Sequence, residues 1–234
     1  LGSCAHAAAN DAIALGDESF ANNSYTAAVG VRANAKASYD SAFGAQANAT
    51  GGHSTSVGGW TNSTGGYSSA FGYTATAEGN YSIAIGYNTS GLGTWSSAVG
   101  ASANAIGGSS SAFGYLSVAT GDRSAAFGSR ANAYGRSSLS LGDRSKSSGS
   151  ESTAVGYGAN SSGNQATALG SYSNSSGNNS AALGYKANSS GVNSIAIGFN
   201  SNSQSVNSIA IGTQAKTSSY SEGVAIGNGA ASSG

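Results

Sequence analysis

One short pattern of apolar and small residues recurs along the whole chain. In this pattern Ala or Ser and then one bulky apolar residue precede a glycine. The glycines of the pattern follow one another every 14 residues from Gly2 to Gly212, and Gly227 ends the series after a step of 15. A fixed period of this kind predicts a repeat architecture, so we interpret it before any local signal. The extra residue of the last step falls between Thr217 and Glu222.

Each repeat carries two short alternating segments when its glycine is numbered position 0. Position −2 is Ala except at Ser56 and Ser140, position −4 is mostly Ser, positions +3 and +5 are small, and position +7 is usually a second Gly. Alternation with a period of two predicts strands around −4 to −1 and +2 to +6. A glycine near each strand end provides the freedom, including positive φ, that a tight turn needs. The expected fold is all-β, one solenoid domain over residues 1–234 built from about 16 parallel coils of 14 residues.

The inside and outside of the predicted coil follow from side-chain size and parity. So narrow a coil has room only for small side chains, so positions −4, −2, +3 and +5 are expected to face inward. Position −1 has the opposite parity to −2 and is expected to point outward. The residues at position −1 are Leu15, Val29, Phe43, Val57, Phe71, Ile85, Val99, Phe113, Phe127, Leu141, Val155, Leu169, Leu183, Ile197, Ile211 and Ile226.

This apolar column predicts an oligomer. Soluble monomers rarely expose a continuous apolar strip of such length. A closed ring of identical chains packed on a common axis is the simplest arrangement that covers it. The number of chains in that ring does not follow from the residues.

The apolar strand motif carries a family resemblance. Ser82-Ile83-Ala84-Ile85-Gly86, repeated at 194–198 and 208–212 and followed by x-x-A-x-A-x-G, resembles the YadA-like head repeat of trimeric autotransporter adhesins over essentially the whole chain. The resemblance implies a left-handed parallel β-roll and a homotrimer with the −1 column as its core. It also implies a non-enzymatic role at the bacterial cell surface, reached by type V secretion, in attachment to extracellular matrix, host cells or other surfaces.

Several parts of a complete adhesin of this kind are not recognisable in the 234 residues. We find no signal peptide, neck segment, heptad stalk or membrane-anchor strands. The chain is therefore expected to be the head of a longer protein that is held in the outer membrane by a C-terminal anchor.

Composition gives little support to catalytic, metal-binding or nucleic-acid-binding chemistry. Nine Lys and Arg residues balance nine Asp and Glu residues, whereas nucleic-acid binders usually concentrate basic charge. His6 and His53 have no Cys or carboxylate partner at ligand spacing, and the scattered acids form no recurrent acid–base pair. Cys4 is the only cysteine, so no intrachain disulfide is expected. No enzyme activity, cofactor or metal is predicted.

An aromatic column is the first candidate ligand surface. Position +9 carries Tyr25, Tyr39, His53, Tyr67, Tyr81 and Trp95 on six consecutive coils. These rings are expected to stack along one edge, where they either stabilise neighbouring coils or offer a surface for sugars or apolar ligands. Tyr67, Tyr81 and Trp95 are the ligand-contact candidates.

A basic region in the middle of the chain is the second candidate. Between residues 116 and 147 five basic residues, Arg123, Arg130, Arg136, Arg144 and Lys146, accompany two acidic ones, Asp122 and Asp143. They form either an ordinary solvated edge or a basic belt that recruits acidic glycans or acidic protein patches.

Other interpretations remain open at this point. A trimeric phage or virus fibre would share the fold, an ice-binding solenoid would need a regular outward Thr array, and a β-helix polysaccharide lyase or hydrolase would need clustered carboxylates. Asn-x-Ser/Thr sequences that include those at Asn48, Asn62, Asn88, Asn160, Asn174 and Asn188 are expected to be Asn ladders in turns, with glycosylation as the alternative.

Overall fold

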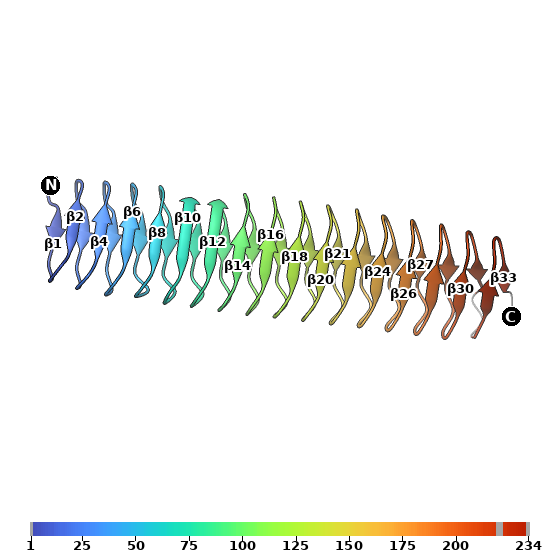
Figure 1. Cartoon of the computed structure of the whole chain (residues 1–234). Coiled ribbons are helices and arrows are strands. Elements are labelled where there is room, and N and C mark those ends of the chain that lie inside the picture. The colour runs from blue at the N-terminus through green and yellow to red at the C-terminus, as the bar shows by residue number, and fades with distance from the viewer. Residues whose placement is uncertain (1, 219–221, 233–234) are drawn as a thin grey trace. The chain divides into compact units, whose positions relative to one another are not determined.

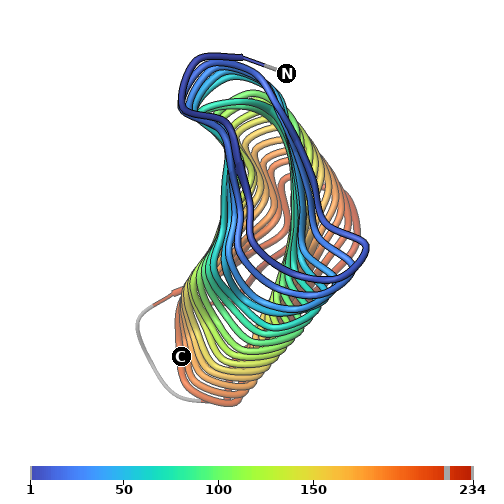
Figure 2. The same cartoon turned by 90° about the vertical axis from the view of Figure 1, so that its left-hand side faces the viewer.

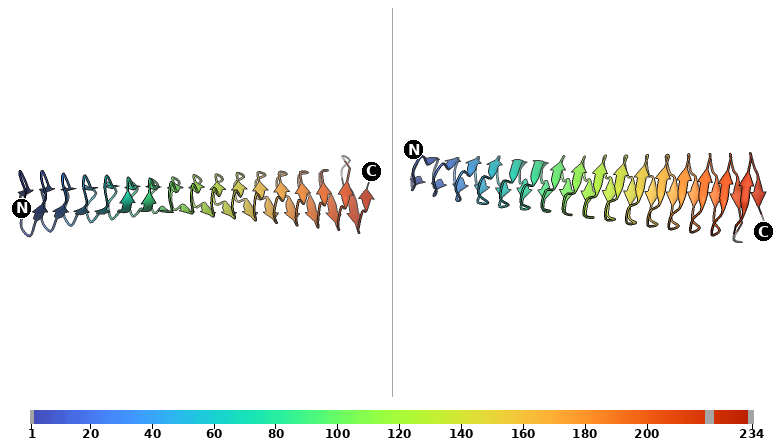
Figure 3. Two further views of the ribbon diagram at one scale, coloured as in Figure 1. Left: turned by 90° about the horizontal axis from the view of Figure 1, so that it is seen from above. Right: turned by 60° about the horizontal axis from the view of Figure 1, so that its bottom comes forward.

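The chain folds into β-strands that are all short. The computed structural model describes residues 2–218 and 222–232, in which every regular element is a β-strand. The chain divides into two compact units, Leu1–Leu116 and Ser117–Gly234. In each unit the odd-numbered strands have two residues and form one parallel sheet, and the even-numbered strands have three to five and form a second. We call these the odd sheet and the even sheet, and their rows of arrows are seen in Figure 1 and from two further directions in Figure 3.

The first unit contains sixteen of the strands. Its odd sheet consists of β1 (His6–Ala7), β3 (Phe20–Ala21), β5 (Asn34–Ala35), β7 (Asn48–Ala49), β9 (Asn62–Ser63), β11 (Thr76–Ala77), β13 (Ser90–Gly91) and β15 (Asn104–Ala105). Its even sheet consists of β2 (Ile13–Leu15), β4 (Ala27–Val29), β6 (Ser41–Phe43), β8 (Thr55–Val57), β10 (Ser69–Tyr73), β12 (Ile83–Tyr87), β14 (Ser97–Val99) and β16 (Ser111–Phe113).

The second unit repeats the same organisation. Its odd sheet consists of β17 (Val118–Ala119), β19 (Asn132–Ala133), β21 (Lys146–Ser147), β23 (Asn160–Ser161), β25 (Asn174–Ser175), β27 (Asn188–Ser189), β29 (Asn202–Ser203), β31 (Lys216–Thr217) and β33 (Ala231–Ser232). Its even sheet consists of β18 (Ala125–Phe127), β20 (Leu139–Leu141), β22 (Thr153–Val155), β24 (Thr167–Leu169), β26 (Ala181–Leu183), β28 (Ile195–Ile197), β30 (Ile209–Ile211) and β32 (Val224–Ile226).

The strand register confirms the 14-residue coil. Within the units each strand pairs in parallel with the strand 14 residues further on, as Phe71 with Ile85 and Ala182 with Ala196. Near the C-terminus Ile209 pairs with Val224, which is 15 residues later, so the inserted residue is confirmed by the register on both sides of it. Residues 219–221, which belong to the segment that holds the inserted residue, lie outside the described residues. Figure 2 looks along the coils and shows each as a flattened loop.

Small side chains fill the inside of the coil, as predicted. Ala28, Ala33 and Ala35, at positions −2, +3 and +5, are all 0% exposed. The largest fully buried side chains in the described part of the chain are four threonines, Thr26, Thr61, Thr89 and Thr217, followed by Asp40. The two sheets therefore approach so closely that the interior excludes every larger side chain.

Asp40 is a buried carboxylate at position −4, where most coils have Ser. Its Oδ2 accepts a hydrogen bond from the Ala37 amide at 2.8 Å. Its Oδ1 accepts three more, from the Gly52 amide at 2.9 Å, the Ser54 amide at 2.9 Å and the Ser54 hydroxyl at 2.8 Å. Four donors compensate the carboxylate for the water it loses on burial, and they tie two successive coils together.

Each coil consists of two halves of seven residues. A left-handed residue occurs at every seventh position from Cys4 (φ 55°) to Gln214 (φ 57°), alternately at positions +2 and +9. We call the turn around +1 and +2, which leads from an even strand into an odd strand, the first turn. The turn around +8 and +9, which leads back to the even sheet, is the second turn. The two turns form opposite edges of the coil.

Both glycine columns lie too close to the next coil for a Cβ, but only one of them adopts positive φ, which corrects part of the sequence interpretation. Glycines at position 0 have φ between 125° and 144°, as predicted for a turn. Those at position +7 do not need positive φ, because non-glycine residues at +2 and +9 adopt the left-handed conformation. Their lack of a Cβ matters instead, since a Cβ on Gly135 would lie 1.9 Å from the carbonyl oxygen of Gly149. Successive coils touch through backbone at this column.

Candidate ligand surface

The −1 column lies on the outer face of the even sheet. All sixteen side chains named above are at least partly exposed, and Leu169 (46%) and Ile226 (66%) are among the most exposed. Ile13 and Ile83, at position −3, add further exposed apolar surface to the same face. The direction predicted for the column is confirmed. In each unit the column gives the even sheet an apolar outer face.

The aromatic ladder forms as the sequence predicts. Neighbouring rings from Tyr25 to Trp95 stack with centroids 4.0–5.0 Å apart and planes within 11° of parallel. Each of the four inner rings has both faces covered by its neighbours, so the ladder presents ring edges and hydroxyls to solvent. Only the outer faces of the two end rings have no ladder neighbour: Tyr25, 54% exposed, is preceded by Asp11 in this column, and Trp95, 59% exposed, is followed by Ser109. The geometry favours coil-to-coil stabilisation over the binding of sugars across Tyr67 and Tyr81.

The five basic residues do not form one patch, because their positions in the repeat face different ways. Arg123 and Arg136 are at positions +9 and +8 and lie on second turns. Arg130 and Arg144 are both at position +2 and lie on first turns, at the opposite edge. Lys146 points outward from β21 of the odd sheet. The structure therefore divides the predicted belt among three surfaces.

The first turns of the second unit bring together aromatic rings that the sequence interpretation missed. Tyr157, Tyr172, Tyr185 and Phe199 follow one another with centroid distances of 5.1, 6.2 and 5.5 Å. Tyr172 is nearly perpendicular to both of its neighbours, at 81° and 90°. Three of the rings are at position +1 and Tyr172 is at position +2, so neither column alone shows the whole cluster. Reading the two turn columns together would have revealed it.

Cations accompany these rings. Nη1 of Arg144 donates a hydrogen bond to the hydroxyl of Tyr157 at 2.7 Å, and the guanidinium carbon lies 5.9 Å from that ring centroid. Nζ of Lys186 lies 5.2 Å from the centroid of Tyr185. A hydrogen bond with Tyr157 raises the pKa of the Tyr172 phenol above its ordinary value.

The asparagine ladders exist, but most of them lie in strands and not in turns. Asn34, Asn48 and Asn62 of the odd sheet are linked by Nδ2-to-Oδ1 hydrogen bonds of 2.8 and 2.7 Å. A second ladder joins Asn160, Asn174, Asn188 and Asn202 in the same way. Of the six Asn-x-Ser/Thr asparagines named in the sequence analysis, only Asn88, which is left-handed at position +2, belongs to a turn. The strand amides thus already have partners in the neighbouring coils.

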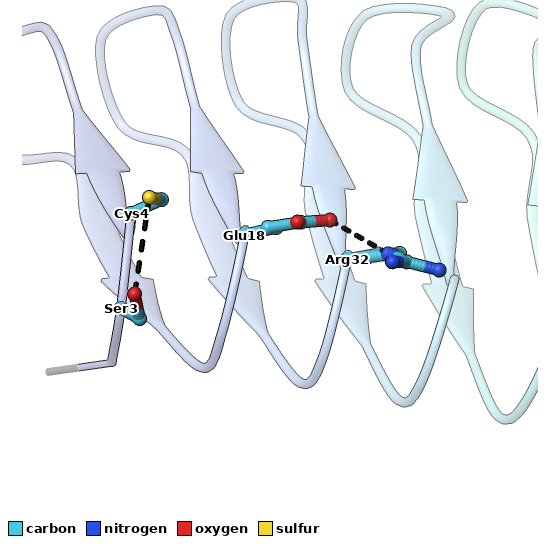
Figure 4. Close-up of polar contacts among 4 residues, drawn as sticks. All are labelled: Ser3, Cys4, Glu18 and Arg32. Atoms are coloured by element: carbon cyan, nitrogen blue, oxygen red, sulfur yellow. Dashed lines mark hydrogen bonds and ion pairs between the residues drawn. The ribbon is translucent and has the colours of Figure 1, made fainter.

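The first coils of the chain contain an ion pair and the cysteine. Figure 4 shows Arg32 paired with Glu18 at 2.7 Å on neighbouring first turns, a contact that raises the pKa of Arg32, and Cys4 exposed beside Ser3. Within residues 2–218 and 222–232 no three His, Cys, Asp or Glu side chains gather closely enough to hold a metal ion, and no pocket is present.

The described part of the chain contains no helix long and apolar enough to cross a membrane.

The repeats match a known family. The sequence profile of the YadA head domain repeat, which spans two repeat copies, matches residues 63–89, 105–131, 119–145, 133–159, 147–173, 175–201 and 203–230. Together these segments cover more than half of the chain. No match was found among curated proteins.

Solved structures similar to this chain include one adhesin domain. It is the collagen-binding domain of the Yersinia adhesin YadA, with 25% sequence identity over 68% of this chain and a TM-score of 0.27. The match covers 65% of that domain, so the chain spans less than two-thirds of its length. The family profile, with its seven matched segments, shows that the chain belongs to the YadA head-repeat family.

Proposed function

We propose that this chain is the homotrimeric head of a bacterial surface adhesin, that it has no enzymatic activity, and that it attaches cells to extracellular matrix, host cells or other surfaces. Anchoring of the whole protein in the outer membrane after type V secretion is part of the same proposal and follows from the family. The observation that carries the proposal is the outward-facing −1 column.

The −1 column is difficult to reconcile with a free monomer. Removing one such side chain from water contributes about 1.5–3 kcal/mol before entropy is subtracted. The column recurs once per coil, so a partner that covers it must have the same repeat. A second and third copy of this chain meet that requirement, because parallel copies around a common axis present equivalent coils to one another.

Charges placed on the −1 column test the trimer. Val99→Asp with Phe113→Asp would bring carboxylates from every chain to the common axis, where loss of hydration is costly. We expect sedimentation to show a trimer for the wild-type protein and a dissociated or strongly destabilised assembly for the double variant.

Leu92→Asp with Ile106→Asp is the matched control. Both residues are apolar and exposed, at 38% and 42%, on the outer face of the odd sheet in neighbouring coils. This variant adds the same charge without touching the even sheet, so its trimer should persist. A wild-type protein that sediments as a monomer, or a control variant that dissociates equally, would contradict the trimer proposal.

Attachment is tested separately from assembly. Wild-type protein should bind to surfaces coated with matrix proteins, collagen among them, in a solid-phase assay, and it should bind more strongly than to albumin-coated surfaces. Equal retention on matrix and albumin would contradict the adhesive role and leave the trimer unaffected.

A further inference from the structure

The first turns of the second unit carry a surface that combines ring faces with positive charge. We call it the aromatic–cationic edge. It consists of Arg144, Tyr157, Tyr172, Tyr185, Lys186 and Phe199. These residues lie in five successive coils of one unit, each within one position of the left-handed turn residue.

Within this edge, Tyr172 differs from the rings of the aromatic ladder in what it exposes. Ladder rings are parallel and cover one another, whereas Tyr172 stands nearly perpendicular to Tyr157 and Tyr185. One side of the Tyr172 ring lies against Gly158, where an added Cβ would come within 3.2 Å of Cδ1 of the ring. Tyr172 nevertheless remains 49% exposed. A ring held by a glycine on one side and not stacked by parallel neighbours can pack against the face of a sugar.

The cations keep free donors for an anion. The hydrogen bond to Tyr157 uses one of the five N–H groups of the Arg144 guanidinium, so the others can bind a carboxylate or sulfate. Lys186 is exposed on the turn two coils beyond Tyr157. Asp143 is the one acidic residue at positions +1 and +2 between residues 129 and 214, so positive charge prevails along the edge.

The opposite edge of the same unit has different chemistry. Its second turns between residues 121 and 207 contain no aromatic residue, and Arg123 and Arg136 are balanced there by Asp122 and Glu151. The combination of rings and excess positive charge is therefore confined to one edge.

We propose that the aromatic–cationic edge binds a linear anionic polysaccharide whose charge comes from sulfate or carboxylate groups. The proposal rests on the adhesive function above and names the ligand class of one surface of the head. Coils repeat every ~4.8 Å along the edge, a spacing close to the length of one sugar unit. Successive sugars can therefore meet successive coils, with anionic groups on Arg144 and Lys186 and a sugar face on Tyr172.

Binding of the intact chain to three immobilised polysaccharides tests the proposal. The probes are heparin, which carries sulfate and carboxylate, hyaluronan, which carries carboxylate alone, and neutral dextran. We expect binding to heparin that weakens as salt rises, and no binding to dextran. If hyaluronan binds as well as heparin, carboxylate groups are sufficient for binding. If hyaluronan does not bind, the edge requires sulfate.

Paired variants locate the binding. Arg144→Ser with Lys186→Ser should weaken heparin binding by about tenfold, a change of about 1.4 kcal/mol. Arg123→Ser with Arg136→Ser removes the same charge from the opposite edge and should change affinity by less than about twofold. Tyr172→Ser with Tyr185→Ser should abolish the part of the binding that resists high salt. Ser102 and Ser171 occupy the same two columns natively, so these variants are expected to fold.

Gly158→Ala removes no charge and no ring, and it tests the placement of Tyr172. A methyl group at this position would displace the ring, so heparin affinity should fall while circular dichroism remains that of the wild type.

Two results would overturn the proposal. One is equal loss of heparin binding in the two arginine-containing double variants, which would indicate a response to net charge only. The other is a wild-type protein that binds matrix-coated surfaces but none of the anionic polysaccharides. In that case the adhesive function would stand and its contact surface would lie elsewhere.

Discussion

At the scale of single residues, the hydroxyls at position −4 fall into two groups. Ser180, Ser194 and Ser208 each contact a serine hydroxyl five residues earlier and donate to a turn carbonyl. Seven consecutive ones, Ser68, Ser82, Ser96, Ser110, Ser124, Ser138 and Ser152, have no partner among the described residues. In five of these coils position +5 is Ala or Gly, which offers no hydroxyl. The same buried column therefore stabilises some coils and costs free energy in others.

Ser96→Ala and Ser194→Ala make this difference measurable. Ser96→Ala removes an unpaired buried hydroxyl, so the free energy of unfolding should stay constant or rise by up to about 1 kcal/mol. Ser194→Ala leaves the buried Ser189 hydroxyl without its partner and should lower that free energy by about 1–2 kcal/mol. Chemical denaturation of both variants checks the prediction. Equal destabilisation by the two substitutions would contradict it.

At the scale of strands and turns, the position +7 glycines set how closely coils approach. A Cβ on Gly65 would lie 2.2 Å from the carbonyl oxygen of Gly79. Backbone cannot yield as a flexible side chain does, so Gly65→Ala should lower the free energy of unfolding by at least about 1–3 kcal/mol, the usual cost of overpacking. Gly59→Ala, at the other turn of the same coil, brings a Cβ only to 3.4 Å from the Tyr73 ring and should be tolerated. Thermal unfolding of the two variants provides the comparison, and similar melting temperatures would disprove the argument.

The strands and their inward residues could be predicted from the sequence because one period fixes both. Ala at −2 and a bulky residue at −1 have opposite parity, and the burial of Ala28 beside the outward Val29 follows directly. The turns were harder to predict. A left-handed conformation at Tyr67 or Arg144 is not signalled by residue type, since such residues disfavour it and adopt it here because the flanking strands fix the chain at both ends.

A candidate surface could be predicted from the sequence only where one repeat position carries all of its residues. The ladder was predictable because all its rings share position +9. The aromatic–cationic edge was missed because Tyr157 and Tyr172 occupy two adjacent columns of the first turn, which have to be read together. The five basic residues were grouped into a belt because they lie close together along the chain. Charges counted along the chain, such as Arg136 and Arg144, belong to opposite edges of the coil.

At the scale of the whole molecule, the seven-residue half-coil makes deletions informative. Removing residues 164–177 takes out one full coil. Asn160 would then meet Asn188 and Ser161 would meet Ser180, which restores the ladder and the buried serine contact of the neighbouring coils. In a protein whose coils contact mainly their neighbours, such a deletion should preserve the β-sheet signal and the trimer.

Removing only residues 164–170 has a different consequence. Inward positions −4 and −2 are seven residues from +3 and +5, so the following half-coils still present small residues to the interior. Position −1, however, moves to the outer face of the other sheet, so Leu183 and Ile197 no longer continue the column that ends at Val155. We expect this variant to keep much of its β-structure by circular dichroism but to dissociate in sedimentation, whereas the 14-residue deletion stays trimeric. If both deletions assemble equally well, the −1 column is not what holds the chains together.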